Sequence, residues 1–266
     1  MTPLCALFPD REVRMSASKS MQALCALSKK ELTFLAESPA APGAVIFMLL
    51  GCGIPFLFPA HNVMVPDFTL EQYVSRIPLL SVLFFPAIAA GCWESERKNG
   101  SMNILLSFPV PNLVLVAGKI VPQFFIYAIT LMLALPLVLS LPALTESSMA
   151  IAGSGVVFST YVMFLLFGFT LASLTTYLSI RFEGNVVPFL LSASCIFIFD
   201  TIHLVPSLVF LPARLAQVCA WLSAAWHLES ASRGILDSRD ILFFLIPSIL
   251  LLFASTLRLD HIRRNP

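Results

Sequence analysis

Long apolar segments alternate with short polar segments along most of this chain. Apolar runs occur at about residues 43–59, 77–93, 120–140, 150–178, 186–206 and 241–257. About 20 helical residues cross the hydrocarbon layer of a bilayer, so these runs predict six transmembrane helices. The first run contains Gly51, Gly53 and Pro55, which predicts a kink toward its outer end.

A shorter amphipathic segment precedes the first apolar run. Its apolar side chains fall roughly on one helical stripe: Met21, Leu24, Leu27, Leu32 and Leu35. Lys29, Lys30 and Glu37 provide a polar side, and the sequence SPAAPG at 38–43 breaks the chain before the first span. This pattern predicts a helix that lies in the membrane interface. The alternative is an ordinary cytoplasmic extension of the first span.

The segment from about 207 to 240 is half apolar and half polar. It carries Trp221 and Trp226 among several charged residues. Tryptophan is enriched at membrane interfaces, so the segment predicts short re-entrant helices on the outer side, between spans five and six. Gly234 is expected to make a turn, and Asp237 is expected to cap the last span.

Composition agrees with a membrane protein. The chain is 58% hydrophobic and 12% charged, whereas a soluble domain has about 25% charged residues. The fold class is therefore predicted to be an all-α integral membrane protein. A formal net charge of +1 gives no indication of nucleic-acid binding. The six cysteines form no Cys-x-x-Cys pair and are expected to pack as small apolar residues.

The N-terminal residues and the positions of Lys and Arg predict the domain boundaries and the orientation of the chain in the membrane. Residues 1–21 are expected to form a polar leader, with Met1, Met15 or Met21 as the start, and residues 22–266 to form the six-span domain. Twelve of the sixteen Lys and Arg residues fall on one side if the N-terminus is cytoplasmic, which predicts that both termini are cytoplasmic. These residues are Arg11, Arg14, Lys19, Lys29, Lys30, Arg97, Lys98, Lys119, Arg181, Arg258, Arg263 and Arg264. Arg76, Arg214, Arg233 and Arg239 fall outside.

A dense charged loop separates spans two and three. Glu94, Glu96, Arg97 and Lys98 lie within five residues, and lipid does not solvate such charges. Asn99 and Gly100 are expected to end one helix in a left-handed turn, and Ser101 is expected to cap the next. Pro109 and Pro111 should stop that second helix. The loop thus predicts a small rigid helix at the membrane surface that a soluble partner can contact. The alternative is a plain positive-inside topology signal, which does not explain the two glutamates or the glycine break.

Three stretches together resemble the permease subunits of ABC-2 type exporters. They are LSKKELTFLAESP at 27–39, ESERKNGSMNILLSFPV at 94–110 followed by Gly118 and Lys119, and HLESASRGILDSRD at 227–240. The last is similar to gliding-motility-type and related bacterial permeases. The resemblance extends from about residue 22 to 260. Where that family commonly has an acidic residue after Gly-Thr, this chain has Met102 and Asn103 after Gly100 and Ser101, so an ion pair with the partner at that site is not expected.

The resemblance implies a transport subunit of the bacterial cytoplasmic membrane that is not itself an enzyme. It implies a pair of permease copies, identical or different, with separate ATP-binding subunits docked beneath them. The chain lacks the Gly-x-x-x-x-Gly-Lys-Ser/Thr phosphate loop, so ATP and magnesium are expected in the partner and no cofactor in this chain. The expected coupling residues are Glu94, Glu96, Arg97, Lys98, Gly100, Ser101, Met102, Leu105 and Leu106, together with Ile104.

Asp200 and His203 are the ionisable residues predicted near the outer end of span five. They lie three residues apart and share a helix face. They either line the translocation path or mark a helix end already at the headgroups. The hydroxyl residues Thr170, Ser173, Thr175, Thr176, Ser192 and Ser194 are expected to support helix packing, and Arg181, Glu183 and Gly184 a tight cytoplasmic turn.

Other function classes fit the sequence less well. A secondary transporter or channel that works alone would usually show charged or broken helices at the bilayer midplane, whereas the charges here concentrate in loops. An intramembrane enzyme is disfavoured because His61, His203, His227 and His261 have no metal-binding spacing. A haem-export permease has only an analogy of fold in its favour. The sequence contains no signal that identifies the transported molecule.

Overall fold

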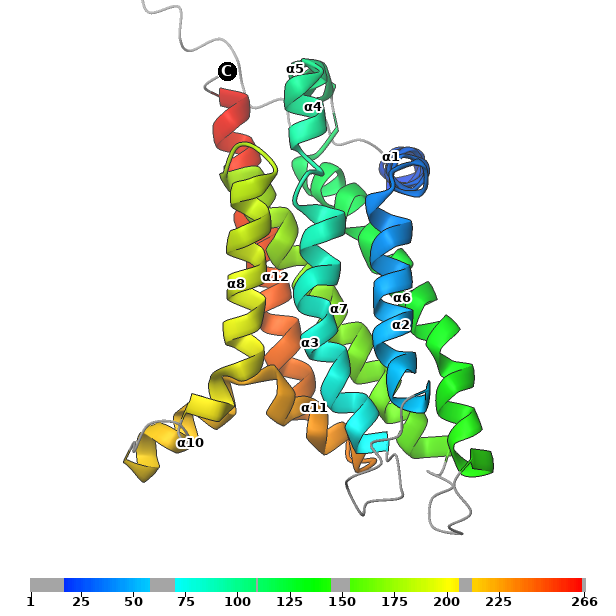
Figure 1. Ribbon diagram of the computed structural model, residues 1–266. Coiled ribbons are helices and arrows are strands. Elements are labelled where there is room, and N and C mark those ends of the chain that lie inside the picture. Colours follow the sequence, from blue (N-terminus) through cyan, green and yellow to red (C-terminus); the bar gives the residue numbers. More distant parts are fainter. Residues whose placement is uncertain (1–16, 58–69, 109, 145–153, 206–211, 265–266) are drawn as a thin grey trace, which may run out of the picture.

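The protein is helical throughout the part described by the computed structural model, which covers residues 17–57, 70–108, 110–144, 154–205 and 212–264. Its long helices are α2 (Ala40–Leu57), α3 (Leu70–Ala89), α6 (Asn112–Leu144), α7 (Ser154–Arg181), α8 (Val186–Thr201) and α12 (Ser238–Arg264). They lie side by side and run alternately in opposite directions (Figure 1). The prediction of an all-α protein is confirmed for these residues.

Within the described ranges, five helical stretches are long and apolar enough to cross a membrane. They are Ser75–Lys98, Asn112–Pro136, Gly155–Arg181, Val186–Leu204 and Ser238–Arg264. Ser20–Glu37 and Ala40–Gly53 form a pair bent by 71° that qualifies as one further candidate. Helix α1 (Ala17–Glu37) lies across the end of the bundle, whereas α2 runs along it (Figure 1). The chain is therefore a multi-pass membrane protein with a transverse helix before α2.

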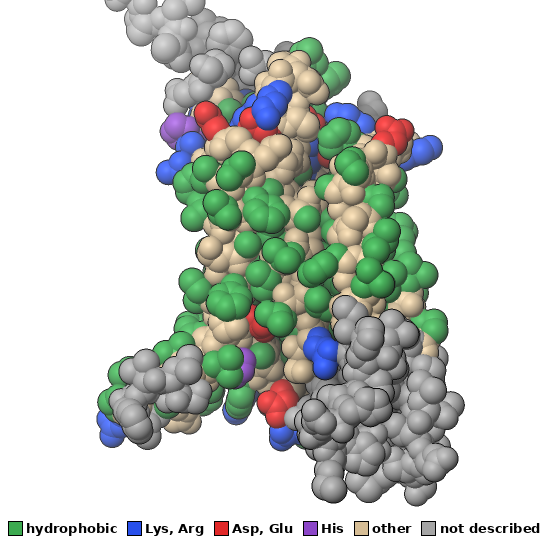
Figure 2. Space-filling view, in the orientation of Figure 1, with side chains coloured by type: hydrophobic (Ala, Val, Ile, Leu, Met, Phe, Trp, Pro, Cys, Tyr) green, Lys and Arg blue, Asp and Glu red, His purple; other side chains and the backbone are tan. Residues whose placement is uncertain are grey.

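The bundle has two chemically similar ends and an apolar middle. Helices α1, α4 (Glu94–Lys98) and α5 (Ser101–Ser107) and the last turns of α12 gather at one end, which we call the α4 end. Helices α10 (Ala213–Leu222) and α11 (Ala224–Ser232) lie at the opposite end, the α11 end. Figure 2 shows charged side chains at both ends and mainly apolar ones between them. This distribution suits a lipid environment around the middle of the bundle.

Several helices are longer than the apolar runs suggest. Helix α6 begins at Asn112 rather than near 120, so Lys119 lies inside it. Residues 17–21, expected in the polar leader, form the start of α1, and Met21 lies within it. Residues 1–16, residues 58 and 59 of the first predicted span, Pro109 and residues 206–211 lie outside the described ranges.

The connection before α12 follows local sequence signals. Gly234 adopts a left-handed conformation with φ of 82°. The Asp237 carboxylate accepts a hydrogen bond of 3.0 Å from the backbone N–H of Arg239, so Asp237 caps α12 as predicted. Two short helices occur in the predicted region, and α10 projects from the bundle while α11 packs against α3 and α7 (Figure 1). Their insertion into the outer leaflet stays a prediction.

Aromatic rings and buried hydroxyl groups join the long helices. The Tyr127 ring of α6 packs against Phe84 and Phe85 of α3, with ring centroids 5.6 and 5.0 Å apart. The Thr170 hydroxyl of α7 donates to its own helix and lies 2.9 Å from both the Phe244 carbonyl and the Ser248 hydroxyl of α12. Such contacts hold helices together where lipid removes the hydrophobic driving force.

Gly168 is required by the close approach of α7 to α6. A methyl group at this position would overlap the ring of Tyr127, which is completely buried. We expect Gly168→Ala to destabilise the bundle by about 1–3 kcal/mol, since a packed aromatic ring has no room to move aside. Thermal unfolding of the detergent-solubilised protein measures this effect. Gly155→Ala is the matched control, because a methyl group there meets no atom of the described chain within 4 Å. Equal unfolding midpoints for the two variants would contradict the packing argument.

Candidate functional site

The charged loop predicted between spans two and three forms two short helices. Helix α4 ends at Lys98 with Asn99 as its C-cap, and Gly100 follows with φ of 66°. This left-handed conformation favours glycine. Helix α5 then covers Ser101–Ser107 and ends in extended backbone at Phe108, as the following proline requires. The prediction of two short helices joined by a glycine turn within residues 94–107 is therefore confirmed. We call residues 94–108 the elbow.

Ser101 differs from its expected role. Its side chain caps no N–H of α5; the hydroxyl donates instead to the Glu96 carbonyl, at 3.4 Å. The left-handed turn at Gly100 brings Ser101 beside the last carbonyls of α4, which lack helical partners. The prediction that Ser101 caps α5 was wrong, and Ser101 helps to close the end of α4.

The side chains of α4 attach the elbow to the turn between α7 and α8. The Arg97 guanidinium donates to the carbonyls of Phe182 and Ile180, at 2.8 and 2.6 Å. These are among the unpaired carbonyls at the end of α7, where a positive charge is also favoured by the helix dipole. A Glu94 carboxylate oxygen accepts a hydrogen bond of 2.9 Å from the backbone N–H of Gly184, whose φ is 81°. Arg97 and Glu94 thus join the elbow to this turn.

A buried ion cluster attaches the elbow to α1 and α6. The ammonium of Lys119, whose side chain is only 1% exposed, lies 2.8 Å from a Glu31 oxygen and 3.0 Å from a Glu96 oxygen. It also donates to the Cys92 carbonyl at 2.7 Å. The Trp93 ring centroid lies 5.0 Å from the same nitrogen. All three ammonium protons therefore have acceptors, which a buried lysine needs.

This cluster, which we call the Lys119 cluster, consists of Glu31, Glu96 and Lys119, with Lys30 at its edge. Lys30 lies 3.4 Å from Glu96 and is itself largely exposed. One oxygen of Glu96 has no hydrogen-bond partner among the residues described. Because breaking a buried ion pair leaves an uncompensated charge, the transverse helix, the elbow and α6 are expected to move as one unit.

The C-terminal helix supports the other side of the elbow. Arg263 of α12 donates to the Phe108 carbonyl at 2.9 Å and to the Asn112 side chain at 3.3 Å. The Asn112 amide in turn donates to Asp260. The segment between α5 and α6 is therefore held by α12.

The predicted coupling residues divide into an inward and an outward set. Met102 and Leu106 are buried within the chain and Leu105 is half-buried. Ile104 is 62% exposed and Phe108 is 55% exposed. Glu94 and Glu96 are buried, Arg97 is half-buried, and Lys98 is exposed. The exposed residues of the elbow are Lys98, Asn99, Gly100, Ile104, Ser107 and Phe108. Ile104 and Phe108 are the large apolar ones among them, and we call these two the apolar tip.

Asp200 and His203 lie together at the α11 end, in contact with the loop before α11. A His203 ring nitrogen lies 2.8 Å from the Asp200 carbonyl and 2.9 Å from the Ser223 hydroxyl. Ser223 donates to the same carbonyl at 2.9 Å. The carboxyl group of Asp200 is mostly buried, and one of its oxygens has no partner in the described part of the chain. His203 and Ser223 thus close the end of α8, while the carboxyl group stays available for another role.

A second histidine at the α11 end, His227, has a structural role that the sequence did not predict. His227 lies 2.6 Å from an Asp240 oxygen and stacks on Phe243, with ring centroids 3.9 Å apart. Its other ring nitrogen lies 2.9 Å from the Trp221 carbonyl, and Ser230 also donates to Asp240. These contacts fix α11 on α12. Among the described residues, no group of three or more His, Cys, Asp or Glu side chains is placed to hold a metal ion.

Comparison with protein-family models gives no match to this chain, and comparison with curated proteins gives no significant relative.

Proposed function

We propose that this chain is the membrane-spanning permease subunit of an ABC-2 type, ATP-driven exporter of the bacterial cytoplasmic membrane. The observation that carries the proposal is the apolar tip: Ile104 and Phe108 are exposed on an elbow that is held within the protein by buried charges. An exposed apolar contact on a rigid support is what a soluble partner needs in order to transmit a movement. The partner proposed is an ATP-binding subunit.

The proposed orientation places the α4 end in the cytoplasm. Twelve of sixteen Lys and Arg residues belong to the segments that this orientation puts inside, as the positive-inside rule requires. With α2 as the first span, the chain crosses six times, so both termini lie on the side of the ATP-binding subunit. Helix α1 then lies in the inner membrane interface, and α10 and α11 belong to the outer leaflet.

The contacts of the elbow suggest how the movement spreads. Closure of two ATP-binding subunits would push α5 through the apolar tip. The Lys119 cluster would pass the displacement to α1 and α6, and Arg97 would pass it to the turn between α7 and α8. A second permease copy, identical or related, completes the translocation path. ATP hydrolysis takes place in the partner, so this chain requires no cofactor of its own.

A stand-alone secondary transporter or channel is the second candidate. The observation in its favour is the buried carboxyl group of Asp200 within the α8 stretch, with an oxygen that has no partner in the described part of the chain. Ionisable groups inside spans often mark ion or substrate paths. The two candidates differ in whether the purified chain transports without a nucleotide-hydrolysing subunit.

Affinity purification from bacterial membranes in a mild detergent tests the proposal. We expect a protein with a phosphate-binding loop to co-purify in an amount comparable to that of the chain, and mass spectrometry identifies it. Purification of the chain alone, together with transport by the chain alone in vesicles, would favour the second candidate and contradict the first.

A further inference from the structure

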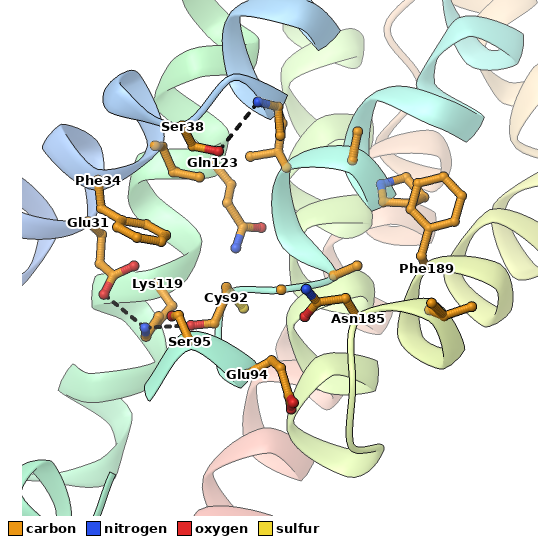
Figure 3. A pocket seen from close by; sticks show the side chains of 18 of the residues that line it. Glu31, Phe34, Ser38, Cys92, Glu94, Ser95, Lys119, Gln123, Asn185 and Phe189 are labelled. Carbon is orange, nitrogen blue, oxygen red and sulfur yellow. Dashed lines mark hydrogen bonds and ion pairs between the residues drawn. The ribbon is translucent and has the colours of Figure 1, made fainter. Parts of the chain in front are cut away.

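A groove of about 690 Å³ opens beside the elbow, between α1, α3, α4 and α8. Figure 3 shows that its walls differ in character: the aromatic rings of Phe34 and Phe189 border it, and polar groups of α1, α4 and α6 converge within it. Apolar walls with a few convergent polar groups are typical of a small-molecule site. The proposed function does not use this groove.

The charges that line the groove cancel. Glu31 and Glu94 contribute two negative charges, and Lys98 and Lys119 contribute two positive charges. Lys119 is directed at Glu31, Glu96 and a backbone carbonyl, and Lys98 lies 3.6 Å from Glu94. No positive charge remains to attract an anionic headgroup, which would also face two carboxylates. The groove therefore favours a ligand without net charge.

Two side chains with little exposed surface present a donor and an acceptor to the groove. The side chain of Gln123 belongs to a residue only 1% exposed, and its oxygen accepts a hydrogen bond from Thr176 at 3.3 Å. Its amide nitrogen donates to none of the described residues and points into the groove (Figure 3). The Glu31 oxygen that does not bind Lys119 faces the same space (Figure 3). Because this nitrogen faces the groove, a ligand that accepts from Gln123 would gain a hydrogen bond.

The groove continues into an apolar stripe on α3. Leu79 and Leu83 are exposed, Ala87 is half-buried, and their four-residue spacing places them on one face of the helix. Ala87 and Gly91, at the end of this stripe, line the groove itself. Ala87 and Gly91 have small side chains, so they leave more space beside α3 than Leu79 and Leu83 do. An acyl chain could therefore lie along the stripe while its headgroup occupies the groove.

We propose that the groove binds a lipid-like amphiphile whose headgroup carries both a hydrogen-bond donor and an acceptor but no net charge, with phosphoethanolamine as the type. The donor would contact Glu31, the acceptor would contact Gln123, and the acyl chain would follow Leu83 and Leu79. This inference rests on the proposed function, because it names the class of cargo that the permease takes from the leaflet at the α4 end.

Photolabelling of the purified full chain in lipid nanodiscs tests the proposal. The probes are phosphatidylethanolamine and phosphatidylglycerol that carry the same diazirine-labelled acyl chain. We expect phosphatidylethanolamine to label the α3 and α8 peptides that contain Leu83 and Leu190, and phosphatidylglycerol to label them several-fold less. Gln123→Leu should lower the labelling about fivefold, the factor for one ordinary hydrogen bond.

Ala87→Phe should remove most of the labelling, because the ring fills the groove. Ala254→Phe is the matched control, because it makes the same change at a half-buried position of α12 that does not line the groove. The lipid probe should label this variant to the same extent as the wild-type protein. Equal labelling by the two lipids in the wild-type protein, or unchanged labelling of Ala87→Phe, would overturn the proposal.

The experiment also separates this inference from the proposed function, because it requires no ATP-binding subunit. Selective labelling of a chain that never co-purifies with an ATPase would retain the amphiphile site and reject the exporter. Absence of selective labelling in a chain that does co-purify with an ATPase would reject the site and retain the exporter.

Discussion

Replacing Lys119 by methionine is expected to leave little correctly folded protein in the membrane. The substitution keeps the length of the side chain but removes the charge that faces Glu31 and Glu96, both of which are buried. Removing one partner of a buried ion pair destabilises a protein by about 3–5 kcal/mol, which approaches the total stability of many domains. The yield of monodisperse protein after detergent extraction, together with its thermal unfolding midpoint, measures the loss.

Two further variants make this result specific. Lys98→Met makes the same chemical change at an exposed lysine of the same elbow and should unfold within a few degrees of the wild type. The triple variant Lys119→Met, Glu31→Gln, Glu96→Gln removes the orphaned charges as well and should recover part of the yield. A Lys119→Met protein as stable as Lys98→Met would show that the Lys119 cluster does not hold α1, α4 and α6 together.

Replacing Ile104 by aspartate is expected to abolish coupling to the proposed ATP-binding subunit while the chain still folds. Ile104 is exposed, so its change disturbs few contacts within the chain, whereas a charge at the centre of an apolar interface leaves a buried group unpaired. A central apolar anchor typically contributes about 2 kcal/mol or more, so the amount of co-purified ATPase should fall at least about tenfold. Quantitative mass spectrometry of the purified complex measures this ratio.

Ile235→Asp is the control for this substitution. Ile235 is 61% exposed, compared with 62% for Ile104, and it belongs to the connection between α11 and α12, away from the elbow. The control should therefore retain the ATPase. Leu106→Asp is a poorer test, because Leu106 is buried in the chain and its loss of function would report misfolding. Retention of the ATPase by Ile104→Asp would place the contact elsewhere.

The sequence predicts most of the fold because the relevant signals are local. Uninterrupted apolar runs mark the long helices, since lipid requires every backbone group to be paired within a helix. The turns at Gly100, Gly184 and Gly234 are predicted correctly because only glycine adopts positive φ without strain. Asp237 caps α12 for an equally local reason. Helix ends are less predictable, since α6 begins about two turns before the apolar run and therefore contains Lys119.

The candidate site is predicted less completely because its partners are distant in the sequence. Lys119 and Glu31 are 88 positions apart, and no spacing rule connects them. Four neighbouring charges in a loop look solvent-exposed, yet Glu94, Glu96 and Arg97 turn inward to contact other helices of the chain. Composition alone does not distinguish a partner within the chain from a partner on another protein.

The division of the elbow into buried and exposed apolar residues is a matter of helix orientation. Helix α5 has only seven residues, which is too short for a hydrophobic pattern to show which side faces the protein. The sequence therefore grouped Met102, Ile104, Leu105 and Leu106 together, although Met102 and Leu106 face the chain and Ile104 faces away. Only the packing of α5 against the rest of the chain shows which of its side chains are buried.

The most direct test of the account is site-specific photocrosslinking in living bacteria. A photoreactive phenylalanine analogue would replace Ile104 in one strain and Ile235 in another, and crosslinked proteins would be identified after illumination. The account predicts that position 104 captures a cytoplasmic ATP-binding protein and position 235 does not. Capture of no such protein at position 104, or labelling of position 104 by a membrane-impermeant reagent added outside the cell, would contradict it.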